Sequence, residues 1–393
     1  MANTSIPVQG QSRTAFHPSG FAALIWGHLA NDALANYLPG LLPLIAVERH
    51  VPLFLLTTLM TILMFGQALQ PLSGLLADRV GGRWFVLGGP LLSVVGVTLV
   101  ALSPGYAGMA VGLFLSGLGT TLFHPQAMAL TRSLAGKRPG LTMSAFMIGG
   151  EFGRAIGPLV ATLLATAAGL DHLWLVGVAV VVTWPWLMRV VPQLAKRTAK
   201  QAPVHFRQHL RPAAALVAFN GLRAGAISTV TTLVPLLWRH HGGSVILGAS
   251  LVTTMIGVGI LGNLAGGLMR DRFGSATVLW GASIVGTLLL IVLPFARGYA
   301  LWPILALVGI ALFSASPVTT LIGQDIFKEN PALGSGISAG MGNAVGALLI
   351  LPIGYAASRI GLSLGLELAA VLLILAFLSI RPLLMATAEH RTA

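Results

Sequence analysis

The sequence predicts an all-α membrane protein with twelve transmembrane helices in two pseudo-symmetric six-helix halves. Three observations lead to this fold class. The 393 residues are 55% hydrophobic and only 8% charged, and the mean hydropathy is +0.87. The apolar residues gather in runs of about 20, the length that an α-helix needs to cross a bilayer. The basic residues gather in the short segments between these runs.

The same composition excludes several classes of protein. A soluble domain carries about 25% charged residues, so this chain could not cover its own surface in water. Disorder requires low hydrophobicity. The absence of cysteine excludes a disulfide framework and a thiolate metal site. The chain contains no ATP-binding glycine loop and no hydrolytic motif, so we expect neither an enzyme nor a cofactor.

The first half follows a polar N-terminal tail, residues 1–20. Its first apolar run is longer than the apolar core of a secretory signal and contains Asn31 and Asp32, so we expect it to be retained. Charge, glycine or proline bounds each run. The six predicted spans of this half, residues 21–191, are 21–47, 53–77, 84–102, 106–130, 141–168 and 173–191.

The second half is separated from the first by the one long polar stretch, residues 192–211, which we interpret as a basic cytoplasmic linker. The second half covers residues 212–381, and a short tail, 382–393, follows it. Its six predicted spans are 213–238, 245–269, 276–295, 301–322, 333–355 and 362–380.

The basic residues set the predicted orientation. With a cytoplasmic N-terminus and alternating sides, the cytoplasmic side receives 17 of the 23 Lys and Arg residues and the outer side four, while Arg154 and Arg223 lie within spans. Cytoplasmic loops carry such an excess of positive charge. The net charge of +13 therefore reflects topology and gives no reason to expect a nucleic acid partner. We expect a monomer in the cytoplasmic (inner) membrane, in contact with lipid, with both termini in the cytoplasm.

The two halves repeat one another. A loop sequence after the second span recurs after the eighth span at an offset of 193 residues. At an offset of 192, His124-Pro125 corresponds to Ser316-Pro317. Repeated halves are typical of secondary transporters, whose sites lie near the midplane between the repeats.

The first loop carries Gly74, Asp78, Arg79, Gly81 and Arg83, in the pattern Gly-x-x-x-Asp-Arg-x-Gly-x-Arg. This pattern resembles the loop signature of the major facilitator superfamily, which implies the major facilitator fold and transport by alternating access. The resemblance further implies that Asp78 and Arg79 make charge contacts that hold the cytoplasmic side closed. The second copy, with Asp271 and Arg272, would play a weaker version of this role.

Three stretches resemble the fosmidomycin-resistance branch of that superfamily, whose members are drug efflux proteins. They are His28-Leu-Ala-Asn31-Asp32, Phe123-His124-Pro125 and the glycine-rich run from Gly149 to Pro158. Within that run, Gly153, Gly157 and Pro158 resemble the fifth-helix signature of the superfamily's antiporters. The alternative interpretation of these glycines is close packing of helices through small residues.

Ionisable groups within a membrane span are costly and are usually functional. His28, Asn31 and Asp32 share one helix face, because they are spaced three and four residues apart. His124 titrates near neutral pH and precedes a proline. We interpret Asp32 and His124 as proton carriers, and His28 and Asn31 as substrate contacts. A structural hydrogen-bond cluster is the alternative.

Glu151 and Arg154 lie three residues apart in the fifth span, where they can form an ion pair. Protonation of Glu151 would free Arg154 to meet an anionic substrate, although a purely structural pair is the alternative. Asn220 and Arg223 occupy the repeat positions of His28 and Asn31, and Asn343 that of Glu151. We interpret Glu151 as a third proton carrier and Arg154, Asn220, Arg223 and Asn343 as further substrate contacts. The expected partner of Arg223 is Asp32, Glu151 or a substrate anion.

These residues together predict proton-coupled export of a small anionic or polar drug or metabolite. Two alternatives stay open. The first is an importer or uniporter of a small anion or a divalent metal ion, for which His28, Asp32 and His124 could be ligands. The second is a membrane sensor with a transporter fold that transports nothing.

Overall fold

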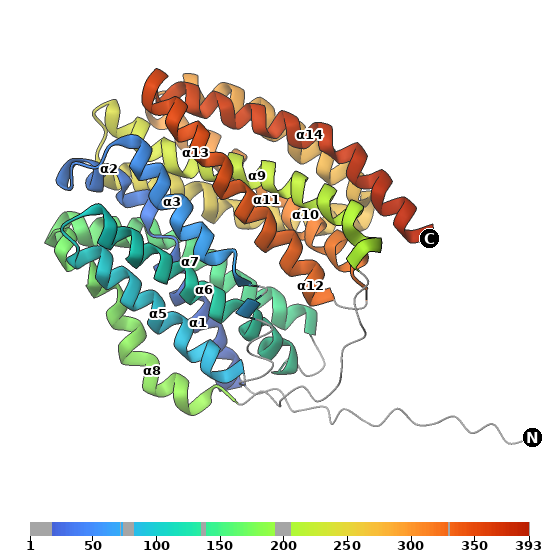
Figure 1. The fold of residues 1–393 in the computed structure, drawn as a ribbon, viewed down its shortest axis with the longest axis horizontal. Coiled ribbons are helices and arrows are strands. Elements are labelled where there is room, and N and C mark those ends of the chain that lie inside the picture. Colours follow the sequence, from blue (N-terminus) through green and yellow to red (C-terminus); the bar gives the residue numbers. More distant parts are fainter. Residues whose placement is uncertain are drawn as a thin grey trace, which may run out of the picture.

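The structure is a computed structural model, and it describes residues 18–70, 72–73, 82–134, 139–192, 206–328 and 331–392. These residues fold almost entirely into helices, and no strand occurs among them, as the sequence predicts. Figure 1 shows the helices as one bundle in which α2 lies at the end away from the C-terminal end of α14.

The helices of the N-terminal half are α1 (Pro18–Ala35), α2 (Leu38–Glu48), α3 (Leu53–Gln67), α5 (Gly82–Leu102), α6 (Tyr106–Leu134), α7 (Pro139–Ala168), a 3₁₀ segment (Leu170–Gly177) and α8 (Val178–Val190). The first predicted span is therefore broken into α1 and α2. Pro39 lies in the first turn of α2, and the side-chain amide of Asn36 donates a hydrogen bond to the Asp32 carbonyl (2.9 Å). A proline favours the start of a helix, because its ring fixes φ and the missing N–H is not needed there.

The helices of the C-terminal half are α9 (Phe206–His240), α10 (Val245–Val292), α11 (Leu301–Ile326), α12 (Pro331–Gly336), α13 (Gly342–Ile360) and α14 (Leu362–Thr392). Short 3₁₀ turns, Leu293–Phe295 and Gly298–Ala300, connect α10 to α11. A π-helical segment, Ile337–Met341, connects α12 to α13.

The segment α10, 48 residues long, consists of two helices that meet at a kink at Gly274, whose backbone is not helical (φ 84°). A straight helix of that length would measure about 72 Å, far more than the roughly 30 Å of a bilayer core. The positive φ is readily adopted by glycine alone. Gly274 therefore separates the eighth and ninth predicted spans.

Among the described residues, eight helices are long and apolar enough to cross a membrane. They correspond to the predicted spans other than the first, second and fifth, with the eighth and ninth joined in one helix. The first span is broken, and α3 has only 15 residues. The chain is therefore a multi-pass membrane protein, while the count of twelve spans stays a prediction.

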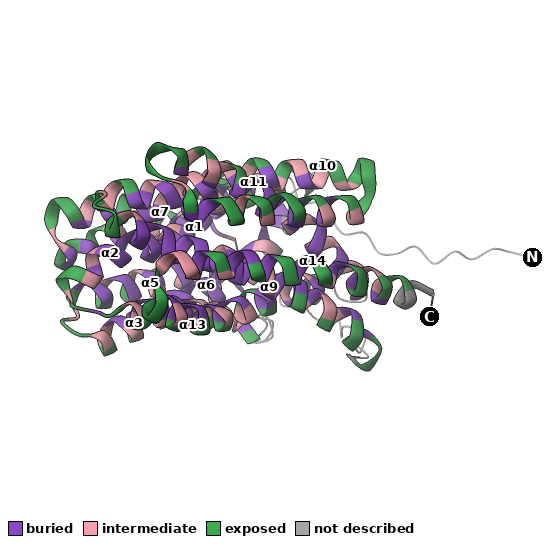
Figure 2. Ribbon diagram, turned by 90° about the horizontal axis from the view of Figure 1, so that it is seen from above, coloured by how far each residue is buried: buried purple, intermediate pink, exposed green. Residues whose placement is uncertain are grey.

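Apolar side chains cover the outside of the bundle, and small residues bring the helices together inside it. Figure 2 shows buried residues gathered along the middle of the bundle and exposed ones along its outer helices. A Cβ atom added at Gly153 of α7 would lie 2.1 Å from the Leu29 carbonyl oxygen of α1. Only glycine allows the two backbones to come so close.

The two halves contact each other through α2, α3 and α7 of the first half and α9, α10, α11 and α13 of the second. The hydroxyl of Thr61 donates to the Ala347 carbonyl (3.0 Å), and that of Ser228 lies 3.4 Å from the sulfur of Met64. A Cβ atom added at Gly354 would lie 2.1 Å from the Thr57 hydroxyl. The α3 residues of these three contacts are spread from Thr57, near the start of the helix, to Met64, near its end.

Candidate functional site

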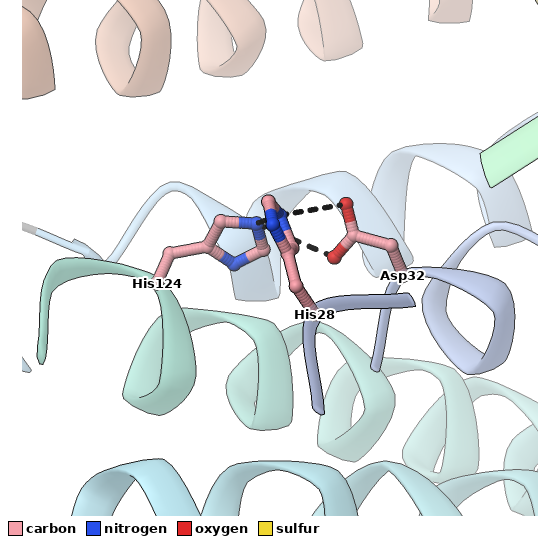
Figure 3. A group of neighbouring side chains, drawn as sticks. All are labelled: His28, Asp32 and His124. Carbon is pink, nitrogen blue, oxygen red and sulfur yellow. Dashed lines mark hydrogen bonds and ion pairs between the residues drawn. The ribbon is translucent and has the colours of Figure 1, made fainter. Parts of the chain in front are cut away.

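A cluster of three ionisable side chains lies between α1 and α6 in the N-terminal half. His28 and Asp32 come from α1 and His124 from α6, and Figure 3 shows the two rings turned toward the carboxylate. Asp32 Oδ2 lies 3.5 Å from His28 Nε2, and Asp32 Oδ1 lies 3.3 Å from His124 Nε2. The two Nε2 atoms are 3.2 Å apart. We call these three residues the His-Asp-His cluster.

The other nitrogen of each ring is held by the backbone. His28 Nδ1 lies 2.8 Å from the Phe146 carbonyl oxygen, and His124 Nδ1 lies 3.0 Å from the Thr120 carbonyl oxygen. A carbonyl oxygen only accepts, so each Nδ1 carries a hydrogen and donates it. When a ring is neutral, its Nε2 atom therefore presents a lone pair to the cluster.

The helix α7 holds the ring of His28 in place. The Phe146 ring stacks on it with a centroid distance of 4.1 Å. A Cβ atom added at Gly150 would lie 2.1 Å from His28 Nε2. Gly150 therefore leaves the space that the ring occupies, since any other residue there would displace it.

Asn31 belongs to the same buried network. Its amide nitrogen donates to Asp32 Oδ1 (3.3 Å) and to the Thr120 hydroxyl (3.4 Å), and its amide oxygen accepts from the Ser93 hydroxyl (3.3 Å). Its side chain is fully buried. In this structure, the hydrogen bond from Asn31 helps to fix the position of the Asp32 carboxylate.

A second polar group lies where α7 meets the C-terminal half. Arg154 Nη1 lies 3.1 Å from each carboxylate oxygen of Glu151, and the side chains are 30% and 15% exposed. The guanidinium of Arg154 also lies 5.7 Å from the centre of the Phe313 ring of α11. Next to it, Ala155 packs against Phe313 and α10. The predicted ion pair is thus present and faces the other half.

Arg223 of α9 approaches the same stretch of α11 from the other side. It donates from Nη1 to the Leu312 carbonyl (2.9 Å) and the Ser316 hydroxyl (3.1 Å), and from Nη2 to Asn220 Oδ1 (3.4 Å). Its Nε atom is buried, and no partner for it lies in the described part of the chain. Its hydrogen bonds go to neutral groups, so neither Asp32 nor Glu151 pairs with it directly, while the third predicted partner, a substrate anion, stays a prediction. Glu151 and Arg154 do not bond to Arg223, but their charges interact with its guanidinium at longer range.

The side-chain amide nitrogen of Asn220 makes its hydrogen bonds within the C-terminal half. Its amide nitrogen donates to the carbonyl (3.0 Å) and the hydroxyl (2.9 Å) of Ser338. Ser338 lies in the π-helical segment that precedes α13, and single π turns inside α-helices often occur at functional sites. Asn343, just beyond that segment, is exposed.

The sequence did not predict the residues that hold these groups in place, among them Thr120, Phe146, Gly150, Phe313 and Ser338. For one contact a signal was present. The repeat offset of 192 pairs His28 with Asn220, Asn31 with Arg223 and His124 with Ser316. Since the first helix of the first half contacts the fourth at His124, the repeat indicates that Arg223 contacts Ser316 in the second half.

Comparison with known protein families supplies the assignment of the chain. Residues 24–350 match the family model of the Major Facilitator Superfamily. The chain belongs to this superfamily. It is therefore a transporter and not an enzyme, and a transporter of this superfamily acts on a small-molecule substrate.

Relatives and solved structures agree with a major facilitator transporter. The chain is 26% identical to an uncharacterised MFS-type transporter, YfnC, of Bacillus subtilis (strain 168), covering 89% of this chain and 90% of that protein. It is 24% identical to the fosmidomycin resistance protein of Escherichia coli (strain K12), covering 94% and 93%. The fold matches that of the nucleoside transporter NupG with a TM-score of 0.78 at 13% identity, covering 93% of this chain and 99% of that one.

The superfamily's loop signature is described only in part. Gly74, Asp78, Arg79 and Gly81 lie outside the described residues. Arg83 donates to the Met188 carbonyl, and its guanidinium lies 5.9 Å from the Trp84 ring centre. In the second copy, Asp271 lies 3.3 Å from Arg270 and is 73% exposed, and Arg272 lies over the Phe273 ring (5.2 Å).

The antiporter-like motif of this major facilitator protein lies at the contact of α7 with α1. A Cβ atom added at Gly157 would lie 2.6 Å from the Ala33 carbonyl oxygen. Pro158 follows inside the helix. The packing interpretation of Gly153 and Gly157 accounts for this geometry, and the motif's link to antiport stays a prediction.

Proposed function

We propose that this transporter exports a small anionic or polar compound across the inner membrane in exchange for protons, by alternating access, with both termini in the cytoplasm. One observation carries the proposal. Two arginines from opposite halves, Arg154 and Arg223, reach the same stretch of α11, and one carboxylate, Glu151, neutralises one of them. Positive charge at the junction of two moving bodies suits an anion whose binding must respond to their movement.

The exchange follows from the Glu151–Arg154 pair. While Glu151 is ionised, both of its oxygens hold Arg154 Nη1. When Glu151 takes up a proton, its attraction for Arg154 is lost. Exchange requires the two ligands to cross in separate steps: the proton crosses inward on Glu151 with no anion on Arg154, and the anion crosses outward on Arg154 after Glu151 has released its proton. Glu151 and Arg154 are partly exposed, so both proton and substrate reach them.

One relative supports export. It is named for resistance to fosmidomycin, and removal of a drug from the cell is one way in which a transporter confers resistance. Fosmidomycin is therefore the first compound to test on this chain.

The test is flux in proteoliposomes that contain the purified protein and an imposed pH gradient. We expect the gradient to drive substrate uphill in the direction opposite to the protons. Glu151→Gln should lose gradient-driven flux and keep downhill exchange. Glu367→Gln, which alters an exposed acid of α14, should change neither.

Three results would contradict parts of the proposal. Loss of exchange as well as uphill flux in Glu151→Gln would show that Glu151 binds substrate or supports the fold. Flux of a metal ion, or of an anion without proton movement, would favour the importer or uniporter. No flux with any anionic compound would favour a sensor.

A further inference from the structure

When both rings are neutral, the His-Asp-His cluster brings three electron-rich atoms together with no hydrogen of its own among them. Both Nδ1 hydrogens are given to backbone carbonyls, so the two neutral rings present lone pairs at Nε2, 3.2 Å apart. The Asp32 carboxylate adds a negative charge at 3.3 and 3.5 Å. Such an arrangement repels itself unless a cation lies within it.

The separations fit a metal ion better than a proton. A hydrogen bond between a charged imidazole and a carboxylate is usually about 2.7–2.9 Å long. Two ligands bonded to zinc at about 2.0 Å, at the tetrahedral angle, are about 3.3 Å apart. The three separations of the cluster, 3.2, 3.3 and 3.5 Å, lie around that value. One ligand atom from each residue is within 4.8 Å of the others.

The surroundings of the cluster are also those of a metal site. Histidine ligands in proteins usually donate their second ring N–H to a carbonyl or a carboxylate, which fixes the ring's direction. Both rings do so here, to Phe146 and Thr120. Ligating carboxylates are themselves hydrogen-bonded, and Asp32 Oδ1 accepts from Asn31.

We propose that His28, Asp32 and His124 bind a divalent transition-metal ion of the Zn²⁺ type within the N-terminal half. Two imidazole nitrogens favour such an ion over Mg²⁺ or Ca²⁺, which prefer oxygen ligands. Three protein ligands leave a fourth position for water or an anionic group. The side chain of His124, 13% exposed, is the most accessible of the three, so this position lies on its side. The proposal does not depend on proton-coupled export.

The test uses Co²⁺ as the probe, since its visible absorption reports the coordination geometry, and Zn²⁺ as the competitor. The full chain is purified in detergent after treatment with a chelator. We expect one Co²⁺ per chain, an intense tetrahedral absorption band that Zn²⁺ removes, and a higher Tm with Zn²⁺ because the ion links α1 to α6. His28→Gln and His124→Gln should each weaken binding about tenfold or more.

Two further variants separate the site from the rest of the molecule. Gly150→Ala places a methyl group where the His28 ring lies, so it should abolish the band without removing a ligand. The double variant His240→Gln/His241→Gln alters a pair of neighbouring exposed histidines, with ring centroids 5.7 Å apart, and should keep the band. Absence of stoichiometric Co²⁺ and Zn²⁺ binding to the unaltered protein would overturn the proposal, as would a band retained in both single His variants.

Discussion

At the residue scale, the repeat places different chemistry at equivalent positions of the two halves. Asp32 of the first half corresponds to Ala224 of the second, while Asn31 corresponds to Arg223. At these two positions the first half thus has a carboxylate, whereas the second half has a permanently charged arginine and no acid. In both halves the charged side chain contacts the fourth helix of its own repeat: Asp32 contacts His124, and Arg223 contacts Ser316.

Arg223→Gln should weaken binding of an anionic substrate and leave binding of a neutral one unchanged. A hydrogen bond to a charged group contributes about 1.5–3 kcal/mol, which corresponds to a loss of affinity of about tenfold to a hundredfold. Equilibrium binding to the purified protein measures it. Arg239→Gln, an exposed change at the end of the same helix, is the control. Equal losses for both substrates would show that Arg223 acts through the fold.

The individual polar residues could be predicted from the sequence, because a charge at membrane depth has a high energetic cost and is rarely present without a role. Their grouping could not. Helical spacing places His28 and Asp32 on one face of α1, but the rotation of α6 that brings His124 to them depends on packing. Gly150 and Phe146 of α7 set that packing for the His28 ring, and neither residue is ionisable.

At the element scale, glycines determine how closely the helices approach. The sequence predicts the runs correctly where hydropathy alone decides, as in α5, α11 and α14. It predicts the first span as continuous, but the structure breaks it after Ala35, because local hydrogen bonding at Asn36 and the proline at 39 override the hydropathy. The eighth span is predicted to end at Met269, whereas the structure continues the helix to the kink at Gly274.

Two alanine substitutions should therefore have opposite effects on stability. At Gly153 the added methyl meets the Leu29 backbone at 2.1 Å, and overpacking of this kind costs about 1–3 kcal/mol. At Gly267 of α10 no atom lies within 4 Å, so alanine gains up to about 1 kcal/mol from its helix propensity. We expect Tm to fall for Gly153→Ala and to rise slightly for Gly267→Ala in thermal unfolding in detergent. A fall of equal size in both would contradict the packing role of Gly153.

At the scale of the whole molecule, α3 and α13 contact each other at Thr57 and Gly354, and Thr57 lies near the start of α3, just after α2. With the orientation predicted from the basic residues, this contact lies on the outer side. Alternating access then requires that the contact of α3 with α13, at Thr57 and Gly354, opens while the opposite ends of the halves come together.

Gly354→Leu should shift the protein from the state of this structure toward the state in which α3 and α13 have separated. The side chain would meet Thr57, whose hydroxyl is 2.1 Å from the Cβ position, and would separate α3 from α13. The chain has no cysteine, so spin labels at Leu72→Cys and Leu268→Cys, which are 62% and 74% exposed, report one distance at the end near the termini. We expect double electron–electron resonance to show a shorter distance in Gly354→Leu. The lipid-side control Gly281→Leu, which has no atom within 4 Å, should leave the distance unchanged.

An unchanged or longer distance in Gly354→Leu would mean that the two ends do not move in opposite directions, and rocking of rigid halves would not describe this protein.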